Sequence, residues 1–324
     1  MVRVPPRGVG APDPRAAAPA AAATSMAESP ALTVSVITPS LDQGRFLGRT
    51  LASVAAQEPP ALEHHVIDGG STDQTLDVLR AAARPGLSWV SERDRGQAHA
   101  VNKGIARTRG DVIAWINSDD VYFPGAFAAA AGFLQAHPQV DVVYGLALHI
   151  DADDRPVSPY PTEAFDPARL HDFCLLCQPA TFFRRRCVER YGLLDERLHY
   201  CMDYEYWLRL ARSGARFAHL PVVLAGSRLH ADTKTLGARV AVHREIIDMF
   251  LRLQGRVPTN WLLGYAGARV GRHVDRARHP QLYAAAAAAG SVLAALRWNH
   301  GLPWDLPALA RAHRARARAG DARA

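Results

Sequence analysis

The sequence predicts an α/β protein with a parallel, doubly wound sheet, and two observations support this prediction. Short apolar segments rich in β-branched residues alternate with helix-like segments four times between Leu32 and Ala136. This alternation is typical of parallel strands that are joined by helices through right-handed crossovers. Small polar and acidic residues also follow several apolar segments, at the strand ends where ligands bind in open α/β sheets.

The first half of the chain contains four expected strand–helix pairs. Each strand is a short apolar run, and the helix after the first strand repeats apolar residues every three or four positions. Pro39 is expected to end the first strand, and Thr72 or Asp73 to cap the second helix. The expected strands cover residues 32–38, 65–68, 87–91 and 111–116, and the expected helices cover residues 46–57, 73–83, 96–107 and 124–136.

The second half is expected to hold fewer and longer elements. A helix over residues 203–213 should end at Gly214, since glycine favours the left-handed C-cap conformation. A shorter helix should begin at Arg184, and residues 156–161 should be irregular. Strands are expected over residues 140–150, 178–183 and 216–225, the last ending near His230.

Asp151-Ala-Asp-Asp-Arg155 is a polar turn between two of these segments. Asp153 and Asp154 carry carboxylates of the kind that bind metals. Because Asp residues also favour tight turns, we expect them to be hairpin-turn residues.

Composition divides the chain into three regions. Residues 1–30 are rich in Ala and Pro and are expected to be disordered. Residues 31–235 carry the α/β pattern. From residue 236 to 324 the pattern is helical, and it ends in a basic segment that contains Arg311, Arg314, Arg316, Arg318 and Arg323.

The formal net charge is +7, and Lys103 and Lys234 are the only two lysines. The arginines are dispersed and no nucleic-acid-binding motif occurs, so nucleic acid is not an expected partner. Cys174 and Cys177 have CxxC spacing, but no second pair matches a zinc site. We therefore expect buried free thiols and a cytoplasmic location. No apolar run is long enough to span a membrane.

The segment Asn117-Ser-Asp-Asp120 follows the fourth expected strand. Adjacent carboxylates at a strand end suit a divalent cation bound to a phosphate-bearing ligand. The same residues would also serve as a helix N-cap before Pro124, and the segment alone leaves both interpretations open. The first strand ends in Thr38-Pro39-Ser40 and not in a G-x-G-x-x-G motif, which argues against a dinucleotide cofactor.

Other polar residues fall beside the expected strand ends. Asp68 precedes Gly69 and Gly70 and would either accept from a base or ribose, or serve as a turn residue. Arg95 and Lys103 would either offset diphosphate charge or lie on a solvated helix face.

Taken together, these segments resemble the family 2 inverting glycosyltransferases. The order and spacing of Thr33–Ser40, Ile67–Asp73, Asp94–Gln97, Asn102–Gly104 and Asn117–Asp120 match that family. Gln178–Arg184, Gly192–Asp195 and Met202–Arg209 resemble its acceptor-side segment, and Ser227–His230 with Lys234-Thr235 resembles the end of its catalytic core. The resemblance covers residues 31–240. It implies the GT-A fold, a mixed doubly wound sheet, and transfer of a sugar from a nucleotide-diphosphate sugar.

The resemblance also implies roles for single residues. Asp119 would bind Mg²⁺ or Mn²⁺, with Asn117 in place of the first acid of the family's D-x-D motif, and Asp120 would orient the donor sugar. His230 matches a residue that in some relatives reaches the metal or the diphosphate, and an imidazole ligand favours Mn²⁺. The remaining donor-binding residues would be Thr38, Pro39, Ser40, Asp68, Asp94, Arg95, Lys103 and Ser118.

Asp203 matches the family's catalytic base, which takes the proton of the acceptor hydroxyl. Met202 replaces the acid that usually precedes it, and Glu205 is the reserve candidate. Because Asp203 should open a helix, we expect the helix dipole to keep its pKa low. Its alternative role is a plain N-cap. Gln178, Tyr204 and Glu205 are the candidate acceptor residues.

Two functions are consistent with these residues. The first is a metal-dependent inverting glycosyltransferase that extends a glycan or lipid-linked acceptor. The second is a nucleotide-sugar-binding module that has lost catalysis, as the replacements at Asn117 and Met202 would allow. The basic C-terminal end would suit peripheral contact with an anionic membrane at its inner face.

Overall fold

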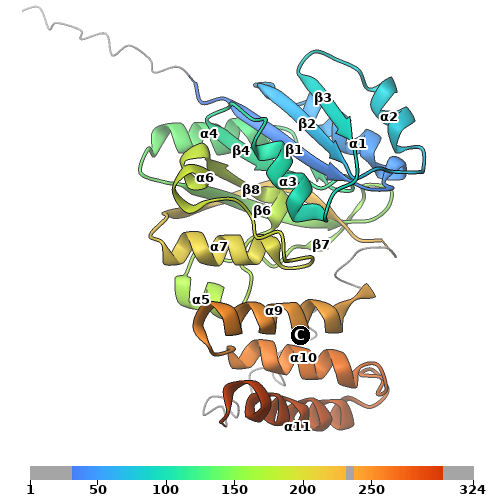
Figure 1. The fold of residues 1–324 in the computed structure, drawn as a ribbon, viewed down its shortest axis with the longest axis vertical. Helices are drawn as coiled ribbons and strands as arrows, with labels where there is room; N and C mark the ends of the chain where they lie inside the picture. Colours follow the sequence, from blue (N-terminus) through green and yellow to red (C-terminus); the bar gives the residue numbers. More distant parts are fainter. Residues whose placement is uncertain (1–30, 231–236, 302–324) are drawn as a thin grey trace, which may run out of the picture. The chain divides into compact units, whose positions relative to one another are not determined.

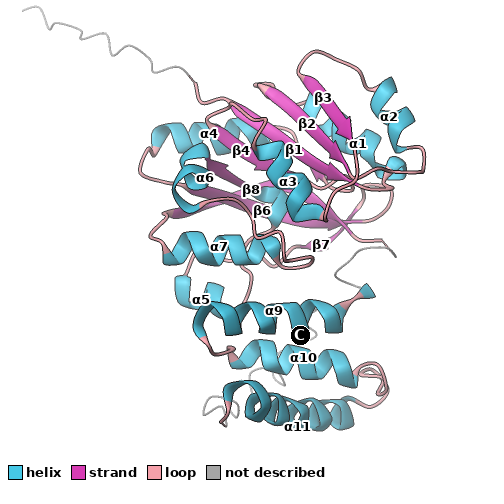
Figure 2. Cartoon of the chain, viewed as in Figure 1, coloured by secondary structure: helices cyan, strands magenta, loops and turns pink. Residues whose placement is uncertain are grey.

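The computed structural model describes residues 31–230 and 237–301. Within these ranges nine strands form one mixed sheet, in the order β3-β2-β1-β4-β8-β6-β9-β5, with β7 paired to β6 (Figure 1). The α/β fold class is confirmed (Figure 2). The segment 1–30, Lys234 with Thr235, and the basic end beyond residue 301 lie outside the described residues.

Four parallel strands form the first half of the sheet, as the sequence predicts. Their carboxyl ends lie at one level, because Ser40 pairs with Asp68 and Asp68 pairs with Ser91. The strands are β1 (Val34–Ser40), β2 (Glu63–Asp68), β3 (Leu87–Ser91) and β4 (Val112–Trp115), and they alternate with helices α1 (Gly44–Ala55), α2 (Thr75–Ala81) and α3 (Gln97–Ile105).

The second half makes the sheet mixed. In this half β8 lies antiparallel between β4 and β6, while β9 runs parallel to β6. The elements are β5 (Val121–Tyr122), α4 (Ala126–Ala136), β6 (Val142–Ile150), β7 (Pro156–Pro159), α5 (Pro167–Asp172), the 3₁₀ helix η1 (Gln178–Ala180), β8 (Thr181–Arg184), α6 (Arg185–Tyr191), α7 (Met202–Arg212) and β9 (Phe217–Arg228).

Several expected boundaries were wrong. Strand β1 continues through Pro39, because β4 pairs with β1 only as far as Ile37 and needs no N–H from the proline. Residues 156–159 form an edge strand, where their prolines are tolerated. Residues 178–180 are helical, since Pro179 occupies the first turn of η1. The short elements β5 and α5 had no clear sequence signal.

Side chains of β4 alternate between two hydrophobic layers, as strand geometry requires. Ile113 and Trp115 join the core formed with α3 and α7, whereas Val112 and Ala114 join the core formed with α4. Helix α3 lies close to β1, since a Cβ at Gly104 would come within 2.4 Å of the Ile37 side chain. This close packing fixes the N-terminus of α3 beside the end of β4.

Three helices follow the sheet: α9 (Arg239–Gln254), α10 (Thr259–Val270) and α11 (Pro280–Asn299). Helix α9 contributes Ile246, Met249 and Phe250 to the same core as α7. The helical character predicted for this region is confirmed within residues 239–299. In the described part of the chain, none of the helices has the length and apolar character needed to cross a membrane.

Candidate active site

A pocket of about 340 Å³ opens where β1 and β4 end. Residues from β1, α3, the loop after β4, the start of α7 and the end of β9 share it. The lining includes Pro39, Ser40, Asp94, Gln97, Asn117, Ser118, Asp119, Asp120, Gln178, His199, Tyr200, Asp203 and Arg228. The polar residues that follow β1 and β4 therefore line one pocket.

The side chain of Asn117 makes three hydrogen bonds to neighbouring side chains. Its Oδ1 accepts from Gln97 Nε2 over 2.6 Å and from Trp115 Nε1 over 3.1 Å. Its Nδ2 donates to Asp120 Oδ2 over 3.2 Å. Because the amide is occupied in this way, Asn117 orients Asp120 and is not placed as a metal ligand.

Asp120 is buried beneath the pocket and lies next to Asp119. Burial, followed by the neighbouring charge of Asp119, raises the pKa of Asp120 well above its usual value. The backbone N–H of Arg228 donates to Asp120 Oδ1 over 2.9 Å. Thr50 Oγ1, on α1, donates to the carbonyl oxygens of Ser118 and Asp120, so α1 also holds the loop 117–120 in place.

Arg228 is a site residue that residue-by-residue reasoning missed. Its side chain is fully buried, and its guanidinium donates to the carbonyl oxygens of Asp119 and Asp151, each over 2.6 Å, and to the carboxylate of Asp154. It thereby joins the pocket loop to the hairpin turn 151–155, which confirms the turn prediction for Asp154. A charged residue near the end of an apolar strand was the available signal.

Asp119 and His230 meet at the pocket rim, with His230 Nε2 3.0 Å from Asp119 Oδ2. Across residues 31–230 and 237–301, no three His, Cys, Asp or Glu side chains gather into a metal site. A carboxylate and an imidazole nevertheless suit a divalent cation whose other ligands come from a bound diphosphate. The side chains present fit such a cation with two protein ligands.

Asp203 lies in the first turn of α7 and lines the pocket. The expected low pKa is wrong: burial, with a smaller contribution from the charge of Glu245, raises the pKa of Asp203 to about 6. Desolvation of the carboxylate outweighs the backbone N–H of Tyr204, which donates to it over 2.8 Å. Helix α7 has its N-cap at Cys201, so Asp203 is not a plain N-cap.

Thr38 and Asp68 lie behind the pocket wall and do not line it. Thr38 Oγ1 lies 2.9 Å from His64 Nε2 in the interior. Asp68 is fully buried and accepts from the N–H groups of Gly70 and Ser71 and from the hydroxyl of Ser91. Of the two roles open for Asp68, these contacts favour the turn residue.

Arg95 and Lys103, for which a diphosphate or a solvated helix face was expected, each pair with an acidic side chain. Arg95 pairs with Glu196, and Lys103 Nζ lies 2.5 Å from Glu92. Neither side chain lines the pocket. Asp94, in contrast, lines the pocket, and a Cβ at Gly69 would come within 2.8 Å of its Oδ2.

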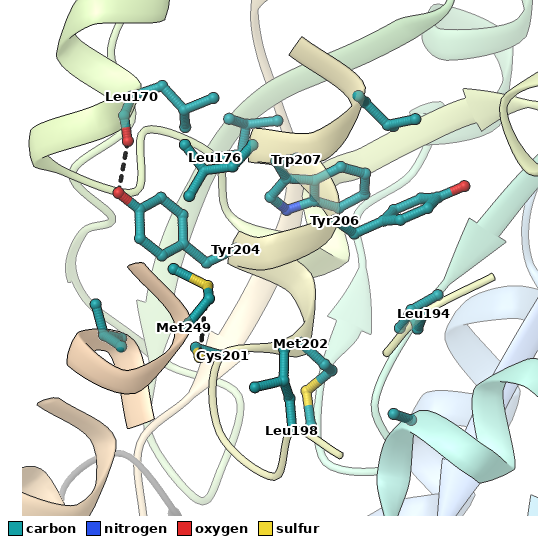
Figure 3. Packing of buried hydrophobic residues seen from close by; sticks show 14 of the residues in the cluster. Leu170, Leu176, Leu194, Leu198, Cys201, Met202, Tyr204, Tyr206, Trp207 and Met249 are labelled. Carbon is teal, nitrogen blue, oxygen red and sulfur yellow. Dashed lines mark hydrogen bonds between the residues drawn. The ribbon is translucent and has the colours of Figure 1, made fainter. Parts of the chain in front are cut away.

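Two of the acceptor candidates, Tyr204 and Glu205, bond to residues outside the pocket lining. The hydroxyl of Tyr204 donates to the carbonyl oxygens of Leu170 and His171 inside the core (Figure 3). Glu205 is buried against Arg209, with Oε1 2.9 Å from Nε. Helical geometry turns these positions away from the face that carries Asp203. Gln178 does line the pocket, and its Nε2 donates to the Trp115 carbonyl.

The four cysteines are free thiols, and Cys177, Cys187 and Cys201 are buried. The prediction of buried free thiols is confirmed for these three, whereas Cys174 is a free thiol that is partly exposed. Gln97, His199 and Tyr200 line the pocket but were not singled out from the sequence. Gln97 belongs to the segment Asp94–Gln97, which resembles a motif of the family, whereas the loop with His199 and Tyr200 carries no recognisable pattern.

Residues 35–192 match the model of glycosyl transferase family 2. An uncharacterized glycosyltransferase of Mycobacterium tuberculosis is 31% identical over 260 residues, which cover 78% of this chain and 93% of that protein. The chain belongs to glycosyltransferase family 2. A glycosyltransferase of this family transfers a sugar from a nucleotide-sugar donor, so the predicted enzyme class is confirmed.

Two other relatives match this chain over shorter stretches. A PGL/p-HBAD biosynthesis glycosyltransferase of Mycobacterium tuberculosis is 30% identical over 195 residues, which cover 58% of this chain and 74% of that protein. The chain spans 65% of the length of an uncharacterized glycosyltransferase of Rickettsia prowazekii, with 29% identity over 217 residues.

Solved structures with the same fold support the GT-A prediction. The S. aureus protein TarS, residues 1–349 in complex with UDP-GlcNAc, has a TM-score of 0.57 at 18% identity, covering 90% of this chain and 88% of that chain. The mannosyltransferase PcManGT from Pyrobaculum calidifontis, in complex with GDP-Man and Mn²⁺, has a TM-score of 0.56 at 20% identity, covering 89% and 81%.

Proposed function

We propose that this glycosyltransferase inverts the anomeric centre, moving a sugar from a nucleotide-diphosphate sugar to a hydroxyl of a glycan or lipid-linked acceptor. The observation that carries the proposal is the position of Asp203, a half-buried carboxylate with a pKa of about 6 on the wall of the pocket. At neutral pH such a group is largely ionised and is a stronger base than an ordinary aspartate.

The donor would lie along the strand ends. Pro39, Ser40 and Asp94 line one part of the pocket, and Ser118 and Asp120 line another. Backbone and small side chains at the end of β1 allow a nucleotide to approach closely, as in other open α/β sheets. Asp68 is buried and its carboxylate already accepts hydrogen bonds, so its role would be to shape the adjoining turn.

Asp119 and His230 would hold Mg²⁺ or Mn²⁺. The structure of PcManGT in complex with GDP-Man and Mn²⁺ supports a divalent cation in this fold. Such a cation would neutralise charge on the departing diphosphate. Asp120 and Asn117 would keep Asp119 in place through the loop contacts described above. Arg95 and Lys103 are paired with acidic residues and are not assigned to this task.

Asp203 would accept the proton of the acceptor hydroxyl while Gln178 and Tyr200 shape the acceptor end of the pocket. A lipid-linked acceptor would bring the enzyme to the inner face of a membrane. The exposed side chains of Leu293 and Leu296 on α11, next to Arg297, would suit contact with anionic lipid headgroups.

A thermal-shift screen tests the donor site. The full-length protein is melted with UDP-, GDP- and dTDP-sugars, each with and without Mn²⁺. A ligand that binds the folded state raises the melting temperature by mass action. We expect a metal-dependent rise with one nucleotide class. Saturable binding with neither nucleotide release nor transfer would instead favour a binding module without catalysis.

A further inference from the structure

Residues 199–201 come shortly before Asp203 in the chain. Their backbone N–H groups bond to the side chain of Glu245, on the C-terminal helix α9. Its Oε2 accepts from the N–H of His199 over 2.8 Å. Its Oε1 accepts from the N–H of Tyr200 over 2.7 Å and from the N–H of Cys201 over 2.9 Å. Three successive backbone donors thus converge on one carboxylate.

These donors immediately precede the first turn of α7, which begins at Met202. The first N–H groups of a helix and the residues before it have no partner within the helix. A carboxylate at this position satisfies them and also interacts favourably with the helix dipole. Glu245 therefore serves as a cap supplied by a helix 44 residues beyond Cys201 in sequence. The N-cap residue Cys201 makes no side-chain cap hydrogen bond of its own.

Packing around this cap is dense. Cys201 Sγ lies 3.9 Å from Met249 Sδ, one turn along α9 from Glu245 (Figure 3). The Tyr204 ring packs edge-on against Phe250, with centroids 6.0 Å apart, and against Trp261 of α10. The start of α7 is consequently seated between the pocket on one side and the C-terminal helices on the other.

The same carboxylate acts on Asp203 through charge. Glu245 contributes to the raised pKa of Asp203, after burial. The other titratable groups that interact electrostatically with Asp203 are Tyr160, Cys174, Cys177 and Cys201, and burial raises the pKa of each. These groups are neutral at physiological pH, so Glu245 is the charged neighbour of Asp203 in the described residues.

We propose that Glu245 is a positioning residue for sugar transfer: from the C-terminal helices it fixes residues 199–201 and thereby sets the placement of Asp203. This role rests on the proposed function of Asp203 as the base. It gives the helices after residue 236 a part in catalysis, beyond any contact that they make with an acceptor.

The test compares Glu245→Gln with the wild-type protein, using nucleotide release from a donor sugar that the thermal-shift screen has identified. The amide keeps one acceptor oxygen and loses the charge. We expect kcat to fall about tenfold or more from misplacement of Asp203, with an unchanged KM for the donor. The acidic limb of the kcat profile should move to lower pH, because the removed charge had raised the pKa of Asp203.

Asp248→Asn is the matched control, since Asp248 lies on the same helix and pairs with Arg244 at the surface. It should behave as wild type. Glu245→Asp keeps the charge but shortens the reach, so kcat should fall while the acidic limb stays in place. If Glu245→Gln does not fold, the kcat of Glu245→Asp tests the positioning role in its place.

Hydrogen exchange of the amides of residues 199–201 provides a readout that needs no activity. It should be faster in Glu245→Gln. Unchanged exchange, or faster exchange with kcat and the acidic limb unchanged, would overturn the role of Glu245. Absence of nucleotide release from the wild-type protein would instead overturn the proposed function. Faster exchange in Glu245→Gln would in that case still support Glu245 as the cap of α7.

Discussion

His230 Nε2 lies 3.0 Å from Oδ2 of Asp119, although the two residues are 111 positions apart in the chain. Strand β9 brings them together, because its last residues pair with β5, which directly follows Asp120, and with the end of β6. The contact explains how a chain with Asn117 in the first D-x-D position would still offer two protein ligands to a cation.

Replacement of Asp119 by Ala is expected to abolish the Mn²⁺-dependent part of the donor-induced melting shift. The reason is that one imidazole alone binds a hard cation weakly. Thermal melts with donor, in the absence and presence of about 1–10 molar equivalents of Mn²⁺ per protein, measure this part of the shift. Asp153→Ala in the hairpin turn is the control. A full metal-dependent shift in Asp119→Ala would remove Asp119 from the metal site.

Asn117→Asp restores the acid that the family motif usually carries at this position. The substitution replaces the N–H donor to Asp120 by a second carboxylate at about the same 3.2 Å separation. Like charges so close repel, so the variant should melt at a lower temperature than wild type above pH 7 without metal. Mn²⁺ should recover the loss and bind more tightly. Isothermal titration with Mn²⁺ measures the gain, and equal affinity in both proteins would contradict this interpretation of Asn117.

Arg228→Lys should destabilise the protein by about 3 kcal/mol, since one ammonium cannot replace a planar guanidinium that bonds to Asp119, Asp151 and Asp154. Urea unfolding measures the loss. Arg155→Lys on the exposed side of the same turn is the control and should stay within about 0.5 kcal/mol of wild type. If both variants unfold at the same urea concentration as wild type, Arg228 does not join the loop to the hairpin.

The raised pKa of Asp203 also predicts a dependence of stability on pH. A carboxyl whose pKa rises from 3.8 to about 6 on folding binds its proton more tightly in the folded state. Its contribution to stability is present below pH 3.8 and is lost as pH rises through 6. Asp203→Asn cannot ionise, so its melting temperature should exceed that of wild type at pH 8 and approach it at pH 4. A constant difference across this range would show that Asp203 is not desolvated.

The parallel half of the sheet was predictable because its signal is local. Apolar runs, helical spacing and small residues at strand ends each act within a few positions, and the strand over residues 87–91 was placed at its observed bounds. The prolines misled at Pro39 and in β7, where the position of neighbouring strands decides whether an N–H is needed.

The candidate site was predictable only in part. Asn117, Asp119, Asp120 and Asp203 lie on one pocket, as their motifs indicate. What each side chain contacts depends on residues far away in sequence, such as Glu196 for Arg95. The low pKa expected for Asp203 was wrong for the same reason, since burial and the charge of Glu245 depend on tertiary packing and not on the local helix start.

The most direct test of the account is nucleotide release from the donor sugar by wild type, Asp203→Asn and Glu205→Gln, with donor binding measured on the same samples. We expect Asp203→Asn to bind the donor as wild type does and to release nucleotide about 10²- to 10⁴-fold more slowly, as loss of a general base requires. Glu205→Gln should lose stability through its pairing with Arg209 but keep kcat. Wild-type kcat in Asp203→Asn, or loss of kcat only in Glu205→Gln, would contradict the assignment of Asp203 as the base.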